Sequence, residues 1–428
     1  MAVVDEDIDW QLIKNLVFGE GITENVFERW LQPFQFFKNE PTALVQHAGG
    51  PCAVLAPLQA FIIKLCLEEK IQNLQTLSEQ TARMLLRRAI CDILSICRPP
   101  NRVITLATVS KEVASVWQES LEVYPSSKRM KCENVDVDTL HTCLTLETFQ
   151  TVRNLNKFIE DNQIFGSKYD IVCFLYSVIL TRGPTRIINE RQDMDESLID
   201  PVHGHGSQSL INLLITGSAT QNVFDGTRDL CGMDLTGITE QSQIGFLSFL
   251  ECLRYLEVGE NLKSPKFPVW LLGSETHITV LYSRDLWLVQ PPSPREKAIR
   301  IFKELDKDGS GFIPTSQLQE LLTNLNLFAE EEYVAIMKDR VDPDGLGLVL
   351  MPLFLEEFFP EFQGGAPDSF TLYHYNGLSK TGSGEYIKGE AVLLEGMSGR
   401  ADNNPMLQTI QTKWPSIAVD WERPPSIN

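Results

Sequence analysis

Apolar side chains recur at every third or fourth position along much of the N-terminal half of the chain, which is the spacing of one face of a helix. The longest apolar run, residues 52–70, has little polar interruption and predicts a buried helix. Further helices are predicted at residues 6–18, 25–31, 74–97, 145–159, 169–181, 207–216 and 242–256. The first part of the chain is therefore expected to be mainly helical.

Short runs of β-branched and aromatic residues follow at residues 267–272, 276–282 and 286–289. Gly-Ser and Ser-Arg-Asp turns separate them, so we expect three strands of an antiparallel meander. A proline-rich stretch ends this meander, and strand character returns at residues 370–375 and 417–421.

The residues between these two groups of strands, 295–363, have a helical pattern of their own. The simplest arrangement is a main domain formed by residues 1–292 and completed by residues 366–428, with the helical module inserted late in its sequence. We therefore predict an α+β fold.

The chain has 428 residues and a net charge of −20, from 57 acidic and 37 basic residues. It lacks a dense Lys/Arg run with interleaved aromatic residues, so nucleic acid is not an expected partner. A neutral or basic protein would be favoured electrostatically. The start of the sequence is acidic and does not resemble a secretory signal, and the apolar stretches are too short or too polar to cross a membrane.

We therefore expect a protein of the cytoplasm, the nucleus or both, with no membrane partner. Its nine cysteines should be mostly reduced in those compartments. Because no Cys-x-x-Cys pair occurs and the histidines are scattered, a structural zinc site is not predicted.

The segment that ends at Cys52 carries the most chemistry. Gly49 and Gly50 allow a tight turn and a close approach by a substrate, and Pro51 has its φ preset for a first helical turn. Cys52 would then lie where a helix dipole favours a thiolate and where backbone N–H groups can bind an oxyanion. Gln46 has the spacing at which papain-like peptidases place an oxyanion glutamine, although their signature around the cysteine is absent. The alternative is a buried core thiol.

A nucleophilic cysteine needs a base, and the chain has six histidines. His277 begins a predicted strand, and period-two alternation places His277 and Thr279 on one face of that strand. Papain-like folds supply their histidine from a strand that faces the helix of the cysteine, so His277 is the candidate base. The alternative is a histidine that is hydrogen-bonded at a strand edge.

The segment DPVHGHGSQS, residues 200–209, is rich in glycine and polar groups, which is typical of a functional loop before a helix. Asp200, His203 and His205 are candidates for substrate contact or for ordering the site. Capping of the following helix by Ser207 or Ser209 is the structural alternative. A metal site at the two histidines is not favoured, because no third ligand is evident.

Residues 306–317 follow the pattern of a calcium loop, and a second, more degenerate loop follows at residues 342–353. The candidate ligands of the first loop are Asp306, Asp308, Ser310, Phe312 and Gln317. Position twelve normally carries a bidentate Glu, so the neutral Gln317 predicts weak calcium binding at most. The pattern favours a paired EF-hand-like module that serves as a structural unit or as a docking site for a protein partner.

The segments GGPCAV, IDPVHGHGSQSLINLLITG, LKSPKFPVWLLGSETHITV and YHYNGL occur in this order and resemble the MINDY family of deubiquitinases. The resemblance extends over nearly the whole chain and is strongest to family members with an EF-hand unit. It implies a papain-like cysteine peptidase, without a required cofactor, that cleaves isopeptide bonds in polyubiquitin. It also implies a preference for the lysine linkage that marks proteins for the proteasome.

The resemblance assigns roles to individual residues. The nucleophile of the family matches Cys52, its catalytic histidine matches His277, and its oxyanion glutamine matches Gln46. The family carries a small hydroxyl residue two positions after its histidine, which matches Thr279 and implies a third member of the site. A threonine hydroxyl can accept from an imidazole N–H, but it cannot stabilise imidazolium as a carboxylate does.

The two glycines before the cysteine would then form the narrow channel that the Gly-Gly tail of ubiquitin requires, with simple turn geometry as the alternative. Two other functions remain open: a catalytically silent ubiquitin-binding scaffold, and a cysteine hydrolase that acts on another acyl substrate. The intact Gln46, Cys52 and His277 argue against the scaffold. Only the resemblance selects ubiquitin as the substrate.

Overall fold

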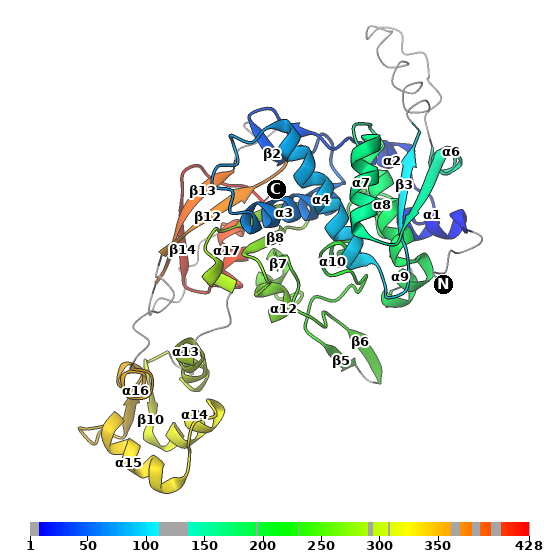
Figure 1. Cartoon of the computed structure of the whole chain (residues 1–428). Coiled ribbons are helices and arrows are strands. Elements are labelled where there is room, and N and C mark those ends of the chain that lie inside the picture. The colour runs from blue at the N-terminus through cyan, green and yellow to red at the C-terminus, as the bar shows by residue number, and fades with distance from the viewer. Residues whose placement is uncertain are drawn as a thin grey trace.

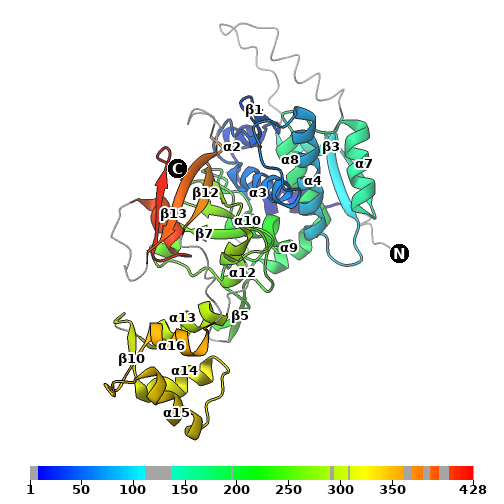
Figure 2. The same cartoon turned by 60° about the vertical axis from the view of Figure 1, so that its left-hand side comes forward.

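The computed structural model describes residues 8–110, 136–193, 196–230, 232–289, 294–306, 309–360, 369–378, 386–394 and 404–427. Helices from the first half of the chain cover one side of a twisted sheet, and a smaller helical unit lies apart from both (Figures 1 and 2). The chain therefore has the mixed α+β architecture expected from the sequence.

The sheet has six strands in the order β14-β13-β12-β9-β8-β7. The strands are β7 (Gly245–Ser248), β8 (Val269–Gly273), β9 (Ile278–Tyr282), β12 (Ser369–Tyr375), β13 (Ile387–Leu393) and β14 (Ile417–Trp421). Only β7 and β8 run parallel, and the other neighbours are antiparallel. Because β9 pairs with β12, residues that follow the helical unit in sequence complete a sheet that begins before it.

The helix α3 (Cys52–Glu68) packs against β8 and β9. Its first fifteen residues are buried, because α4 (Glu79–Cys97), α8 (Asp170–Arg182) and α10 (Gln208–Thr216) cover the side that faces away from the sheet. A helix buried on all sides is apolar all round, which explains the uninterrupted run in the sequence.

Strand alternation divides the core into two layers. Val269, Leu271 and Val280 face the helical side of the sheet, whereas Trp270 and Leu281 face the opposite side. That opposite side is covered by α17 (Pro405–Gln411) and by the buried side chain of residue 427.

Smaller elements surround this framework. The helices are α1 (Trp10–Phe18), α2 (Glu24–Trp30), α6 (Val137–Cys143), α7 (Val152–Asn162), α9 (Pro184–Glu190), α11 (Phe249–Cys252) and α12 (Glu260–Lys263). The two-stranded sheets are β1 (Phe36–Phe37) with β2 (Glu40–Leu44), β3 (Ile104–Val109) with β4 (Leu144–Phe149), and β5 (Thr227–Leu230) with β6 (Met233–Thr236).

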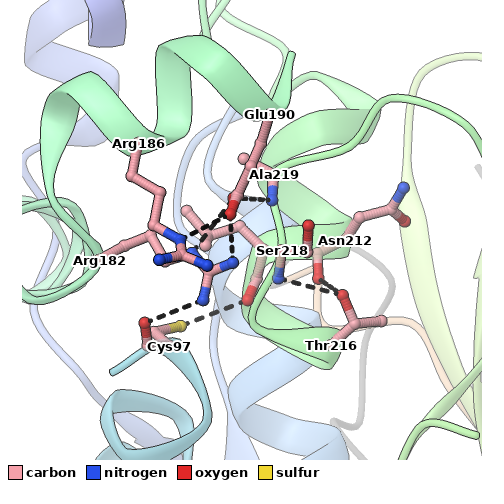
Figure 3. A network of polar contacts seen from close by, with 9 residues as sticks. Cys97, Arg182, Arg186, Glu190, Asn212, Thr216, Ser218 and Ala219 are labelled. Atoms are coloured by element: carbon pink, nitrogen blue, oxygen red, sulfur yellow. Dashed lines mark hydrogen bonds and ion pairs between the residues drawn. The ribbon is translucent and has the colours of Figure 1, made fainter. Parts of the chain in front are cut away.

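A buried ion pair ties several helix ends together (Figure 3). The Glu190 carboxylate on α9 accepts from the guanidinium of Arg182 on α8 and from the backbone N–H of Ala219, at 3.0 Å. Arg182 also donates to the carbonyl of Cys97 at the end of α4. The turn after α10 fits closely against α4, since a Cβ atom on Gly217 would lie 2.2 Å from the carbonyl oxygen of Ile96.

The helical unit, residues 294–360, contains α13 (Pro294–Leu305), β10 (Phe312–Pro314), the 3-10 turn η2 (Thr315–Gln317), α14 (Leu318–Asn324), α15 (Glu331–Val341), β11 (Leu348–Leu350) and α16 (Met351–Phe358). It forms two helix–loop–helix halves whose loops pair through β10 and β11. Phe302, Leu321 and Phe354 are fully buried in a core that the unit forms from its own residues.

Three predicted elements are wrong. The helix predicted over residues 145–159 is the strand β4 followed by α7, which starts afresh because the side chain of Thr151 accepts from the N–H of Asn154. Residues 242–256 contain β7 and the short α11 in place of one helix. Residues 286–289 form the 3-10 turn η1 (Leu286–Val289), so the third antiparallel strand of the meander is β12.

Within the described ranges, no single helix has both the length and the apolar content of a membrane span. The helices α8 and α9 meet those criteria only together, as a pair bent by 80°.

Candidate active site

Cys52 is the first residue of α3, directly after Pro51 at the N-cap. Its side chain is only 5% exposed, and its Sγ lies 3.7 Å from the carbonyl oxygen of Gly50. Burial raises the pKa of the Cys52 thiol to about 11, although the backbone amides of Ile278 and Ala53 act in the opposite direction. The helix position alone predicts a thiolate, but the loss of hydration outweighs it here.

His277 immediately precedes β9 and is 7% exposed. Its Nε2 lies 2.8 Å from the backbone carbonyl oxygen of Asn376. Burial lowers the pKa of His277, and hydrogen bonding to Asn376 opposes that shift. Ile278, the residue next to the candidate base, lines the same small pocket as the candidate nucleophile Cys52.

The hydrogen bond to Asn376 fixes the tautomer of His277. A carbonyl oxygen only accepts, so Nε2 must carry the proton in this contact. The lone pair of the neutral ring is then on Nδ1. This nitrogen is left free to take a proton from a neighbouring group.

Gln46 is buried and shares the lining of a small pocket with Cys52 and Thr279. Its Nε2 donates to the carbonyl oxygen of Ala48 at 3.0 Å, and its backbone N–H donates to Gly377 O at 2.8 Å. An amide nitrogen carries two protons, so one N–H of the Gln46 side chain remains available for an oxyanion.

Thr279 has a different partner from the one that the family resemblance implies. Its Oγ1 lies 2.9 Å from Nε2 of His374, and both residues are buried. His374 lies on β12, and burial lowers its pKa to about 3, so the ring is neutral. The structure therefore places the Thr279 hydroxyl against His374, and its proposed role beside His277 stays a prediction.

Gln59, about two turns along α3 from Cys52, holds the strand that leads to Gln46. Its Oε1 accepts from the N–H of Leu44 at 2.7 Å, and its Nε2 donates to the carbonyl oxygen of Thr42 at 2.9 Å. Each of these bonds joins α3 to β2 in a buried environment. The helix of the cysteine and the strand of the glutamine are thus fixed to each other.

Asn376 is the functional residue that sequence reasoning missed. It follows β12 and lies 99 positions from His277, so no local pattern pairs the two. It belongs to the quoted segment YHYNGL, and papain-like sites orient their histidine with Asn or Asp. That requirement, combined with the pairing of β9 and β12, was the signal that could have identified it.

The loop of residues 200–206 lies against the start of α3, since a Cβ atom on Gly206 would come within 2.3 Å of the Ala53 side chain. The Asp200 carboxylate accepts from backbone N–H groups inside the loop, including that of Val202 at 3.0 Å. The indole of Trp30 on α2 donates to the carbonyl oxygen of Gly204 at 3.0 Å. Asp200 thus orders the loop, and α2 holds it beside the site.

The rings of His203 and His205 are stacked, with centroids 6.2 Å apart, along an open groove that also contains Glu20 and Glu196. Burial lowers the pKa of His205, which in turn is close enough to His277 to help lower the pKa of that residue. The loop therefore brings His205 within electrostatic range of the candidate base.

The two candidate caps of α10 behave differently. The Ser207 hydroxyl accepts from the N–H of Leu210 at 3.3 Å and caps the helix. The buried hydroxyl of Ser209 has no hydrogen-bond partner in the described part of the chain. The structural alternative for this segment is thus observed at Ser207, alongside the placement of the loop beside Cys52.

Comparison with known proteins decides the family. The family model described as "Deubiquitinating enzyme MINDY-3/4, conserved domain" matches residues 14–298, which include Gln46, Cys52 and His277. This chain belongs to the MINDY-3/4 family of deubiquitinating enzymes. Membership makes it a ubiquitinyl hydrolase, with ubiquitin or polyubiquitin as its substrate.

Similar proteins extend the match over nearly the whole chain. The human "Ubiquitin carboxyl-terminal hydrolase MINDY-3" is 42% identical, covering 97% of this chain and 98% of its own length. The MINDY-3 homolog of Drosophila melanogaster is 38% identical over 97% of this chain and 82% of its own. The bovine "Probable ubiquitin carboxyl-terminal hydrolase MINDY-4" is 31% identical over 68% of this chain and 38% of its own. No solved structure matches.

In this MINDY-3/4 chain, the glycines before Cys52 serve the turn and its packing. Gly50 has a φ of +132°, and a Cβ atom there would lie 2.9 Å from Nε1 of Trp30. Gly49 is less confined, since its nearest neighbour would be the Arg29 guanidinium at 3.9 Å. The turn-geometry alternative is thus observed at Gly50, and a channel for a Gly-Gly tail stays a prediction.

In the candidate calcium loop, the carboxylate of the first candidate ligand, Asp306, is hydrogen-bonded to the backbone of the loop itself. Asp306 accepts from the backbone N–H groups of Ser310, at 2.9 Å, and Gly311, at 2.7 Å. Asp308 lies outside the described residues, whereas Phe312 begins β10 and the Oε1 of Gln317 is buried without a hydrogen-bond partner. Across the described ranges, no group of three or more His, Cys, Asp or Glu side chains is arranged to hold a metal ion.

Proposed function

We propose that this deubiquitinase is a cysteine peptidase of papain-like architecture, with Cys52 as nucleophile, His277 as base and Gln46 as oxyanion donor. The observation that carries the proposal is that Cys52, Gln46 and Ile278, the residue directly after His277, line one small pocket. The helix that starts at the cysteine packs against the strand that directly follows the histidine. This is the arrangement that papain-like enzymes use.

The reaction begins with proton transfer from the Cys52 thiol to Nδ1 of His277, the nitrogen that the bond to Asn376 leaves free. The thiolate attacks the carbonyl carbon of the C-terminal glycine of the distal ubiquitin. Gln46 and the backbone N–H of Cys52 stabilise the oxyanion. His277 then returns the proton to the lysine amine that leaves, and water hydrolyses the thioester to free the thiol.

The resting site is closed. Cys52 and His277 are both more than nine-tenths buried, and burial holds the two groups in their neutral forms by raising the pKa of the thiol and lowering that of the imidazole. Substrate must therefore open the site before the proton can move. Catalytic hydrogen bonds often tighten only when substrate is bound.

The preferred substrate is polyubiquitin with the lysine linkage that marks proteins for the proteasome. This preference rests on the family resemblance. Asp200, His203 and His205 are the proposed contacts for a ubiquitin chain, because their loop lines an open groove and packs against Ala53 at the start of α3.

The helical unit serves as an EF-hand-like pair. Asp306 and Asp342 each accept from two backbone amides four and five positions ahead, so the two loops have the same local geometry. The side chain at position twelve of the first loop is neutral, which predicts weak calcium binding. A protein partner that docks on the unit fits this degenerate pattern.

Cleavage of tetra-ubiquitin tests the proposed function. The wild type, Cys52→Ala and His277→Ala are compared on chains of the proteasome-targeting linkage and of the extended signalling linkage. Both variants should lose about a thousandfold in kcat or more, since each removes an essential partner. The wild type should cut the first chain type and leave the second largely intact.

A ubiquitin probe with a C-terminal electrophile separates the alternatives. Labelling of the wild type that is absent in Cys52→Ala supports the cysteine mechanism. Tight binding of the probe without labelling, together with no cleavage of either chain type, would favour a silent scaffold. Cleavage that survives Cys52→Ala would refute the assignment of the nucleophile.

A further inference from the structure

A three-residue turn after β12 contacts both halves of the proposed site. The carbonyl oxygen of Asn376 accepts from Nε2 of His277 at 2.8 Å. The carbonyl oxygen of the next residue, Gly377, accepts from the backbone N–H of Gln46 at 2.8 Å. Leu378 continues this contact through a β-bridge to Gln46. The base and the oxyanion donor are thus placed by consecutive peptide units.

The side chain of Asn376 fixes the conformation of this turn. Its Oδ1 accepts from the N–H of Leu378 at 3.3 Å, and its Nδ2 donates to the carbonyl oxygen of Ser426 at 2.6 Å. Gly377 has a φ of +82°, so the turn passes through a backbone conformation that has little steric restriction at glycine. The hydrogen bonds of the Asn376 side chain therefore restrict the backbone of this turn, which the glycine alone would leave free to adopt several conformations.

The acceptor at Ser426 is held in place by its neighbour. Ile427 is 4% exposed and belongs to the core layer under the sheet, with Leu281, Leu372 and Ile410. Leu281 is on β9, the strand of His277, and Leu372 is on β12, the strand that leads to Asn376. The buried side chain of Ile427 thus anchors the segment whose Ser426 carbonyl accepts from Asn376.

We propose that Ser426 and Ile427 are positioning residues for hydrolysis: Ile427 anchors the segment, the Ser426 carbonyl holds Asn376, and Asn376 holds His277. This inference rests on the proposed cysteine mechanism. None of these groups except His277 touches the reacting atoms. Their effect is to hold the His277 ring in one orientation through its Nε2, which leaves Nδ1 to accept the proton of the thiol.

The pH dependence of hydrolysis supplies a signature that a loss of stability would not produce. The bond from His277 to Asn376 favours the protonated ring, so its loss lowers the pKa of His277. The titratable groups that interact electrostatically with His277 are His205 in the loop and His374 on β12, and Cys52 lines the pocket beside the start of β9. These groups are unchanged in the variants below, so the acidic limb of the rate profile should move to lower pH.

The test compares two isoleucine truncations in the same core layer of the full chain. Ile427→Ala and Ile410→Ala remove the same atoms, but Ile410 lies on α17, outside the catalytic machinery. We expect Ile427→Ala to lower kcat about tenfold, with little change in KM, because small displacements of a catalytic group are costly. Ile410→Ala should lose thermal stability and keep its kcat and pH profile. Ile427→Val should restore most of the kcat.

A deletion of residues 426–428 provides a second variant, which removes the acceptor itself and should reproduce the effect of Ile427→Ala. If both variants keep the kcat and pH profile of the wild type, the inference is wrong while the proposed function stands. If Ile410→Ala shows the same changes as Ile427→Ala, the effect belongs to the core in general and the inference also fails. If the wild type does not cleave ubiquitin chains, or if its cleavage does not depend on Cys52, the proposed function itself is refuted.

Discussion

The hydroxyl of Thr279, two positions after the proposed base, forms a buried pair with the ring of His374. Nε2 of His374 lies 2.9 Å from Oγ1 of Thr279, and its Nδ1 is buried with no hydrogen-bond partner in the described chain. A ring in this position already leaves one nitrogen unsatisfied. Removing the Thr279 hydroxyl would leave both unsatisfied, which is costly in the absence of water.

Thr279→Val should therefore destabilise the protein by about 1–3 kcal/mol, the cost of a buried polar group that loses its partner. Its kcat should fall less than about tenfold, because the hydroxyl contacts His374 and not the base. Urea unfolding and chain cleavage measure the two effects. Thr279→Ser keeps the hydroxyl and serves as the control. A collapse of kcat at unchanged stability would make Thr279 a member of the catalytic site.

Local sequence patterns predict the secondary structure around a single residue such as Thr279, but they do not predict which distant residue, such as His374, it contacts. The sequence predicts the helix that starts at Cys52 and the strand that contains Thr279, because helix entry and strand alternation are local properties. It does not show that His374 bonds Thr279, or that Asn376 bonds His277, because strand pairing brings these residues together across 95 and 99 positions. The balance of burial against the helix dipole at Cys52 is also a property of the packed fold.

Helices and strands that depend on local sequence are predicted correctly, whereas strands that depend on pairing with distant segments are not. The buried helix α3 has a continuous apolar run, and it begins at Cys52 as expected. The segment over residues 145–159 has helical spacing on average, yet its first part becomes β4 because β3 offers a full antiparallel register. The sequence pattern does not predict the strand β13. Its backbone forms a strand through its pairing with β12 and β14, which are distant in the pattern.

Three elements meet at His141, a buried histidine far in sequence from the proposed catalytic residues. It lies on α6, its Nε2 is 2.6 Å from the hydroxyl of Tyr176 on α8, and its ring stacks on Trp10 of α1. Burial lowers the pKa of His141 from 6.5 to about 4. This contact holds the first helix of the chain onto the helical layer.

The stability of the folded protein should therefore fall as pH decreases from about 6.5 to 4. In that window the unfolded chain binds a proton at His141 and the folded chain does not, so protonation favours unfolding. His141→Gln removes this proton and should flatten the slope of unfolding free energy by about 1.4 kcal/mol per pH unit. Denaturant unfolding across this pH range measures the slope of the unfolding free energy against pH. His47→Gln, at an exposed position, is the control. An unchanged slope in His141→Gln would contradict the assignment.

At the scale of the whole molecule, the helical unit and the sheet are separable in their packing. The buried side chains of the unit lie between Ala298 and Phe359 and form their own core. Every residue placed in the proposed site lies outside that range. The sequence predicts such an insertion, because the helical pattern interrupts strands that must share one sheet, but it does not predict that β12 is the strand that pairs with β9.

Replacement of residues 294–365 by a short Gly-Ser linker should therefore leave a folded deubiquitinase. The kcat on tetra-ubiquitin should stay within about threefold of the wild type, because domains with separate cores depend little on each other for folding. The unit alone, residues 294–360, should unfold cooperatively, since its core includes the fully buried Phe302 and Phe354. Circular dichroism of both pieces and chain cleavage by the larger one check these outcomes. A folded larger piece with a raised KM would show that the unit binds ubiquitin chains, whereas a piece that fails to fold would show that the sheet needs the unit in order to form.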